Sequence, residues 1–200
     1  MEFYESINDA IALLENVKDP SHGLPHARGV LDLAKNISVF YSVDEDLLEV
    51  ACWWHDTGVV GGHKNYEILS ASLAYDNLAT HGFNRQLCRK VYDMIRYHRA
   101  SSLPRTIEGK ILMDADKLDL ISVDRWRQCI DMRNTGRVRD LAGNSHIIKI
   151  IPKMRNRVLL LENSRIIFDQ MIADFLDFLY KSSDPEIKSY FNELISRAML

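Results

Sequence analysis

The chain has 200 residues, of which 46% are hydrophobic and 26% charged, proportions typical of a soluble globular protein. Its 25 Lys and Arg residues and 28 Asp and Glu residues give a net charge of −3 at pH 7, so the composition favours neither a nucleic-acid nor a membrane partner. A small phosphate ligand would need only a local cluster of positive charge. A chain of this length can bury a full hydrophobic core, and we expect one domain over residues 1–200.

The cysteines and the N-terminal segment indicate the cellular compartment of the protein. Cys52, Cys88 and Cys129 are odd in number, widely spaced and free of a C-x-x-C pattern, which argues against a disulfide framework or a zinc–thiolate site. Each lies in an apolar helical stretch and is predicted to be a small core residue. The N-terminus carries acids where a signal peptide needs bases, and no apolar run approaches the roughly 20 residues of a membrane span. We therefore expect a cytoplasmic protein.

Apolar residues recur at helical spacing along most of the chain, and no run alternates as a β-strand would, so the predicted fold class is all-α. Pro25 suits a first helical turn. Asp44 is a good N-cap for a helix that contains Trp54 and should stop at Gly58, before a loop over Val59–Lys64. In this part of the chain we predict helices over residues 3–17, 25–41, 65–80, 84–98 and 107–121.

The last third is less regular. Residues 134–146 are rich in Gly and Asn and are predicted to be a loop with extra helical turns. One long helix should span about 153–181, and Asp184-Pro185 should begin a final helix. A domain boundary near residue 135 is conceivable, but the apolar faces downstream need a surface on which to pack.

The adjacent residues His55 and Asp56 end a strongly apolar segment, VACWWHDTG. A charged Asp behind two tryptophans is costly to bury unless a cation or a donor meets it. A histidine with a carboxylate suits a divalent transition ion or magnesium. The dipeptide alone is also compatible with an Asp cap beside a chance histidine.

His26 strengthens the metal hypothesis because it shares the inward face of Val30 and Leu33. A lone inward histidine is usually a hydrogen-bonded core residue, whereas two on different helices can point into one pocket. His22 would share the face if the helix began earlier, but Gly23 and Pro25 place it on the entry loop.

The segment KILMDADKLDL puts three acids into an otherwise apolar helix. Asp116 falls on one face with Leu112 and with either Asp119 or Leu120, and an inward carboxylate there needs a partner. A solvated face would explain Asp114 and Lys117 but not all three acids together.

These residues, in this order, resemble the HD superfamily of metal-dependent phosphohydrolases over about residues 20–125. The family pattern is a histidine, a His-Asp pair and a later aspartate, each on a separate helix of an all-α bundle. Here it reads HARGV at 26–30, HD at 55–56 and DADKLD at 114–119, the last similar to a bacterial subgroup related to nucleotide pyrophosphohydrolases. The resemblance implies an HD-domain helical bundle with a C-terminal helical extension over about 135–200. It also implies one divalent metal ion (Mn, Mg, Fe, Co, Ni or Zn) held by His26, His55, Asp56 and Asp116.

The segment NYEILSAS departs from the family pattern. Relatives often have a His-Glu pair here, whereas this chain has Tyr66 before Glu67, so a second ion would lack that histidine. Glu67 is a candidate general base or water-orienting group. His98 ends an inward stripe; it is either a core or cap histidine or, as the family suggests, a residue that faces the phosphate or a second metal. Basic candidates for phosphate contact are Lys64, Arg96, Arg99, Arg105 and Lys117.

The predicted reaction is metal-assisted hydrolysis of a phosphate ester or anhydride of a small molecule, most simply a nucleotide. Lys117, with His98 or Arg99, would neutralise the developing charge. Within the enzyme class, a phosphatase acting on mononucleotides is the alternative to a pyrophosphohydrolase. Other readings are a nucleotide- or metal-binding sensor with little turnover, and a pure interaction module. Exposed Trp or Tyr faces could support a homodimer.

Overall fold

The computed structural model of the chain describes residues 3–17, 21–62, 64–99, 102–138, 141 and 145–198. Within these ranges every regular element is helical and no strand occurs, which confirms the all-α prediction. The described part contains no helix long and apolar enough to cross a membrane.

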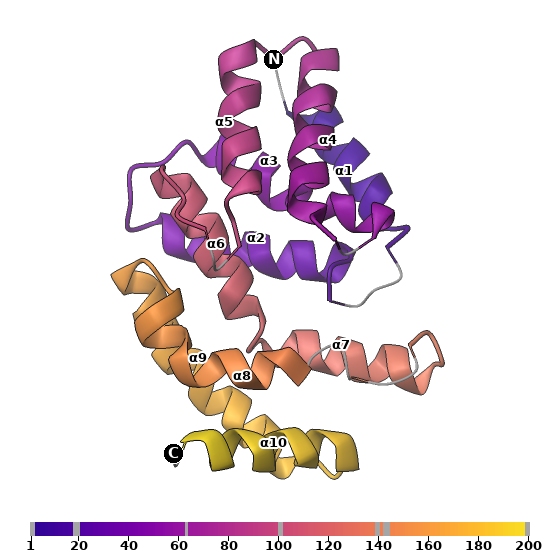
Figure 1. The fold of residues 1–200 in the computed structure, drawn as a ribbon, viewed down its shortest axis with the longest axis vertical. Helices are drawn as coiled ribbons and strands as arrows, with labels where there is room; N and C mark the ends of the chain where they lie inside the picture. Colours follow the sequence, from indigo (N-terminus) through magenta and orange to yellow (C-terminus); the bar gives the residue numbers. More distant parts are fainter. Residues whose placement is uncertain are drawn as a thin grey trace.

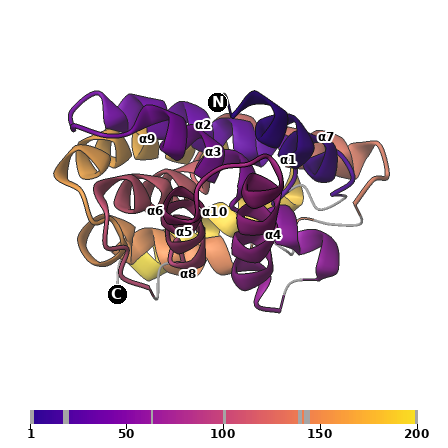
Figure 2. The ribbon, with the colours of Figure 1, turned by 90° about the horizontal axis from the view of Figure 1, so that it is seen from above.

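The N-terminal helices form the upper body of the molecule in Figure 1. Helices α4 and α5 pack side by side and are seen nearly end-on in Figure 2, whereas α2 runs across the molecule and packs on α3 and α6. Trp54 donates its indole N–H to Ser6 Oγ at 3.1 Å and so ties α3 to α1 in the core. The bounds are α1 (Tyr4–Leu14), α2 (Leu24–Ser38), α3 (Glu45–Trp54), α4 (Tyr66–Thr80), α5 (Arg85–Arg96) and α6 (Ile107–Asp119).

The remaining helices lie below this body in Figure 1: α7 (Val123–Asn134), α8 (Ser145–Lys153), α9 (Glu162–Lys181) and α10 (Pro185–Ala198). Trp126 of α7 packs its ring against Phe175 and Tyr190, with centroids 5.4 and 5.6 Å apart. Buried apolar side chains of the upper and lower helices join in one continuous core. The C-terminal apolar faces therefore do have a surface on which to pack.

The structure shows how far the cysteine and aromatic side chains are buried. All three cysteines are buried, as expected of small core residues. The tryptophans are buried too, Trp53 being the most exposed at 7%, so no exposed Trp face exists for a homodimer. Tyr4 and Tyr180 are exposed, at 68% and 61%. Dimerisation itself stays a prediction.

The helix that begins after Asp44 ends at Trp54, so the predicted stop at Gly58 is wrong. Gly58 lies in a 3₁₀ turn, Thr57–Gly61, that occupies part of the predicted loop. A Cβ atom on Gly58 would lie 2.4 Å from the Tyr66 carbonyl oxygen and 2.6 Å from the Ser70 nitrogen. Glycine is therefore needed for the close approach of this turn to α4. The Gly58 N–H donates to Ser70 Oγ at 2.8 Å and fixes the contact.

The prediction of one long helix over 153–181 is also wrong. The helical structure is interrupted at residues 159–161, between a π-helical turn (Met154–Val158) and α9. The break is stabilised from α6. The Asp114 carboxylate accepts hydrogen bonds from the backbone N–H groups of Leu160 and Leu161, each at 2.9 Å. Asp114 thus supplies acceptors at the start of α9 from a distant helix and is buried, not solvated. Helix α7 was not predicted either.

Replacing Asp114 by alanine should lower the free energy of unfolding by about 2–4 kcal/mol, because it leaves two largely buried N–H groups without an acceptor. Asp114→Asn keeps one acceptor oxygen and should lose less. The matched control is Asp174→Ala, which removes an exposed acid from α9 and should change stability by less than about 0.5 kcal/mol. Urea unfolding measures all three; equal stability of Asp114→Ala and wild type would contradict the prediction.

A second stability prediction concerns pH and the contact between α7 and α10. Asp184 caps α10, accepting from the Glu186 N–H at 3.0 Å, and pairs with Arg133. The Arg133 hydrogen bond holds the pKa of Asp184 below its usual value. The ion pair therefore stabilises the fold fully above the unfolded pKa of about 3.9, and this contribution is lost as pH falls below it. Urea unfolding should show Asp184→Asn to be less stable than wild type at pH 7 and the gap to close in acid; a constant gap would refute the assignment.

Candidate metal centre

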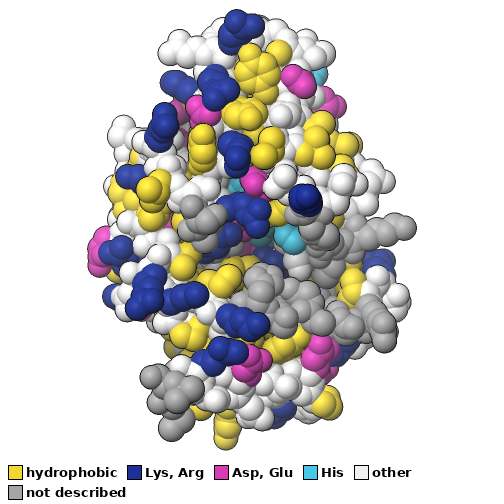
Figure 3. Space-filling view, in the orientation of Figure 1, with side chains coloured by type: hydrophobic (Ala, Val, Ile, Leu, Met, Phe, Trp, Pro, Cys, Tyr) yellow, Lys and Arg dark blue, Asp and Glu magenta, His cyan; other side chains and the backbone are white. Residues whose placement is uncertain are grey.

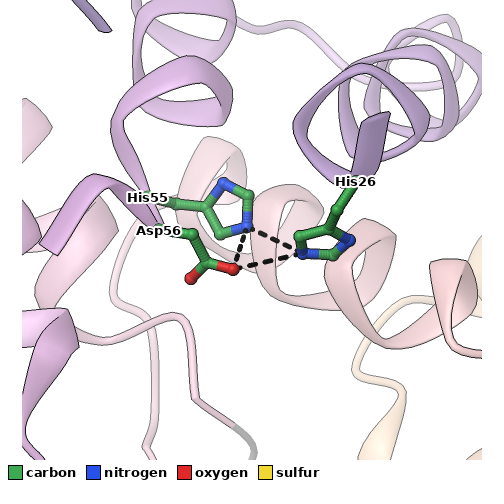
Figure 4. A group of neighbouring side chains, drawn as sticks. All are labelled: His26, His55 and Asp56. Carbon is green, nitrogen blue, oxygen red and sulfur yellow. Dashed lines mark hydrogen bonds and ion pairs between the residues drawn. The ribbon is translucent and has the colours of Figure 1, made fainter. Parts of the chain in front are cut away.

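His26, His55 and Asp56 bring three ligand atoms together inside the molecule. One side-chain nitrogen or oxygen from each lies within 4.8 Å of the other two, close enough for one ion to contact all three. Figure 4 shows His26 projecting from α2 toward the other two side chains, which follow one another at the end of α3. His26 Nε2 lies 3.2 Å from His55 Nε2 and 3.3 Å from Asp56 Oδ2.

The histidine rings are oriented by hydrogen bonds on their outer nitrogens. The Nδ1 atoms of His55 and His98 lie 2.7 and 2.6 Å from the backbone carbonyl three residues earlier. A carbonyl only accepts, so each Nδ1 carries the hydrogen and each Nε2 keeps its lone pair for the interior. His26 Nδ1 instead meets Asp119 Oδ2 at 2.6 Å. Histidines that bind metals are held in this way.

Asp116 approaches His26 from α6. Its Oδ1 lies 3.5 Å from His26 Nε2, and the residue is 6% exposed. Lys117, the next residue, forms an ion pair with Oδ2 of Asp116. Burial opposes the Asp116 charge, but Lys117 and the histidines outweigh it and hold the pKa of Asp116 well below its usual range. The structure thus brings Asp116 beside His26, and Lys117 beside Asp116. Among the described residues, the group whose ligand atoms all lie within 4.8 Å of one another consists of His26, His55 and Asp56 and does not include Asp116.

Two buried atoms in this region have no hydrogen-bond partner among the described residues: Asp56 Oδ1 and His98 Nε2. Burial opposes the charge of Asp56, but His55 and His26 outweigh it, so the pKa of Asp56 is held well below its usual range. Burial lowers the pKa of His98 to about 4, so its ring is neutral at pH 7. Two acceptors therefore face each other 3.7 Å apart. Unpaired buried acceptors cost about 1–3 kcal/mol each, and a cation would satisfy both, so the side chains fit a divalent ion.

A second layer of residues holds His26. Arg125 Nη1 donates to Asp119 Oδ2 at 2.7 Å, and Nη2 donates to the Ser21 carbonyl at 3.0 Å. The Asp119 carboxylate can reach His26 because residue 29 is glycine: a Cβ there would lie 2.5 Å from Asp119 Oδ1. Burial and Arg125 lower the pKa of His26, but the surrounding carboxylates outweigh them and raise it well above its usual value. The carboxylates around His26 thus favour the charged form of its ring.

Sequence reasoning identified this second layer only in part. Asp119 was one of two candidates for the inward face of its helix, and HARGV contains Gly29 without indicating its contact. The sequence did not indicate a role for Arg125. This residue lies on helix α7, which was not predicted, and it contacts Asp119 and Ser21 only in the folded chain.

Glu67 is buried and engaged by two arginines. It is 6% exposed, and its carboxylate lies 3.2 Å from Arg99 Nη1 and 3.6 Å from Arg96 Nη1. Tyr66 packs its ring 6.1 Å from the ring of His98. Burial, assisted by nearby carboxylates, raises the pKa of the Tyr66 phenol, which therefore stays neutral. Of the other basic candidates, Lys64 is exposed and Arg105 lines a different groove between α5 and α6.

The fold and this cluster define a class: an all-α protein with a buried histidine–carboxylate site suited to a divalent ion. Residues 23–121 match the family model of the HD domain. The chain is therefore an HD-domain protein, and its family and site support a metal-dependent hydrolase in general.

Solved structures show the same fold. A predicted HD superfamily hydrolase from an uncultured Thermotogales bacterium is 21% identical, with a TM-score of 0.67 and coverage of 90% of this chain and 91% of that one. Bacillus subtilis YpgQ in complex with ADP is 22% identical, with a TM-score of 0.62 and coverage of 90% of this chain and 99% of that one. No curated protein matches the sequence.

Proposed function

We propose that this chain is a metal-dependent phosphohydrolase that cleaves a phosphate ester or anhydride of a small molecule, with a nucleotide as the substrate class. The observation that carries the proposal is the pair of buried, unpartnered acceptors on Asp56 and His98 beside inward-facing His26, His55 and Asp116. The nucleotide assignment is supported by the similarly folded YpgQ, whose structure is a complex with ADP.

The ion would be held by His26, His55, Asp56 and Asp116. When bound, it supplies a water of lowered pKa and polarises a phosphoryl oxygen. Imidazole and carboxylate ligands accept manganese, magnesium, iron, cobalt, nickel or zinc. The site histidines present Nε2 with the outer nitrogen already hydrogen-bonded, so little reorganisation is needed to receive the ion.

Lys117, His98 and Glu67 take different parts in the proposed reaction. Lys117, whose amino group pairs with Asp116, would neutralise the charge that develops on the phosphoryl group. Neutral His98 offers Nε2 as an acceptor that can orient a water or a ligand hydroxyl. The contacts of Glu67 with Arg96 and Arg99 favour a positioning role, in which its carboxylate aims the guanidinium groups at phosphate oxygens, over that of a general base.

A substrate panel on metal-stripped protein tests the proposal. Each of the six ions is restored in turn, nucleoside mono-, di- and triphosphates are supplied, and released phosphate and pyrophosphate are measured separately. We expect hydrolysis only with an added ion. Pyrophosphate from triphosphates would identify a pyrophosphohydrolase, and phosphate from monophosphates a phosphatase. Failure with every ion and every nucleotide would overturn the proposal in favour of a sensor with little turnover.

A further inference from the structure

A groove between α5 and the start of α6 shares no residue with the metal centre. Its volume is about 590 Å³, within the range of roughly 300–1,000 Å³ found for small-molecule sites. One wall is a face of α5 that runs from Arg85 to Tyr97, and the other is the segment from Pro104 to Gly109. Thr106 is the N-cap of α6, so the positive end of that helix also lies here.

The groove is strongly basic in a chain whose net charge is −3. Its lining contains four cationic side chains, Arg85, Arg89, Lys90 and Arg105, against the single carboxylate of Asp93. Arg89 pairs with Asp93 at 3.2 Å, whereas no described residue forms an ion pair or hydrogen bond with the other three cationic side chains. In the space-filling view, Lys and Arg side chains gather over α5 next to apolar ones (Figure 3).

The exposed surface of the lining is mainly apolar, although only a few apolar residues contribute to it. These residues are Met94, Tyr97 and Pro104, with the aliphatic stems of the arginines around them. A helical peptide would need a longer apolar stripe to dock here. A compact ligand with an anionic end and a flat apolar body matches both parts of the groove, because guanidinium groups bind phosphate oxygens in pairs.

We propose that this groove is a second binding site for a phosphate-bearing small molecule with an apolar ring, of which a nucleoside diphosphate is the model ligand. Arg85, Lys90 and Arg105 bind the phosphates, and Tyr97 with Pro104 contacts the ring. The site does not depend on the metal centre, because neither wall carries one of the proposed metal ligands.

Calorimetric titration of the manganese-loaded protein with an ADP analogue that has a methylene bridge between its phosphates tests this site. We expect two binding events in the wild type. Asp56→Ala should remove the event at the metal centre and leave the groove event. Arg85→Ala/Arg105→Ala should remove the groove event or weaken it at least tenfold. Both arginines are exposed, so the double variant should fold normally.

Lys149→Ala/Lys153→Ala is the matched control, because it removes the same charge from exposed positions on α8 and should leave both events unchanged. If the control variant also lost the groove binding event, the effect of the arginine substitutions would be one of general electrostatics, and the proposal would be overturned. The proposal would also be overturned if the groove binding event persisted in Arg85→Ala/Arg105→Ala. Inorganic pyrophosphate should bind the groove at least tenfold more weakly than the analogue, and equal affinity would refute the contact with an apolar ring. A single event that survives in Asp56→Ala would support the groove even if the metal centre failed to bind nucleotide.

Discussion

Asp56→Ala should lose both its bound metal and its hydrolytic activity. The side chain contributes one oxygen near His26 and His55 and a second, unpartnered oxygen facing His98, so its removal deletes acceptors on two sides of the proposed ion. Loss of a group that only orients a metal ligand already costs about 10–100-fold in affinity or activity. We therefore expect a loss of more than about a hundredfold from removal of a ligand.

Elemental analysis of the purified variant and its hydrolysis rate on the best substrate of the panel measure these effects. His55→Ala should behave in the same way. Asp46→Ala is the matched control, since it removes an exposed aspartate from the first turn of α3 and should keep the full metal content. Thermal unfolding checks that every variant is folded. A folded Asp56→Ala protein that retains full activity without metal would refute the mechanism.

Gly29→Ala should weaken metal binding although the residue touches no ion. Alanine favours a helix by about 1 kcal/mol over glycine, so local propensity alone predicts a more stable α2. The added methyl group, however, would lie 2.5 Å from Asp119 Oδ1 and must displace the carboxylate that holds His26. We expect this steric effect to outweigh the gain in helix propensity at the metal site and to lower metal affinity about 10–100-fold.

Competition with a coloured chelator gives the metal affinity, and nitrogen NMR of the His26 ring reports the loss of its contact with Asp119 independently of activity. Asn36→Ala, an exposed position on the same helix, should leave both readouts unchanged. Wild-type affinity in Gly29→Ala would show that Asp119 does not position His26.

The sequence by itself determined the features that depend on neighbouring residues, namely the positions of the helices and the inward faces of their side chains. Helical periodicity predicted α1 to α6 to within a few residues, because each helix buries one apolar stripe whichever neighbour covers it. Asp44 and Pro185 marked helix starts, since a cap or a proline acts within one turn. The order of the inward histidines and acids was enough to propose His26, His55, Asp56 and Asp116 as one group.

Only the tertiary structure decided which distant groups meet. Asp114 interrupts the predicted long helix from 46 residues away, by accepting the N–H of Leu160. Asp119 is shared by His26 and by Arg125, 99 residues apart in the chain. Glu67 is engaged by Arg96 at the end of α5 and by Arg99 just beyond it. Arg105, a candidate phosphate contact, lies in the groove along α5. Periodicity shows that a side chain faces inward, but the packing of the helices determines which partner it contacts there. For the proposed metal ligands, those partners orient the atoms that would bind the ion.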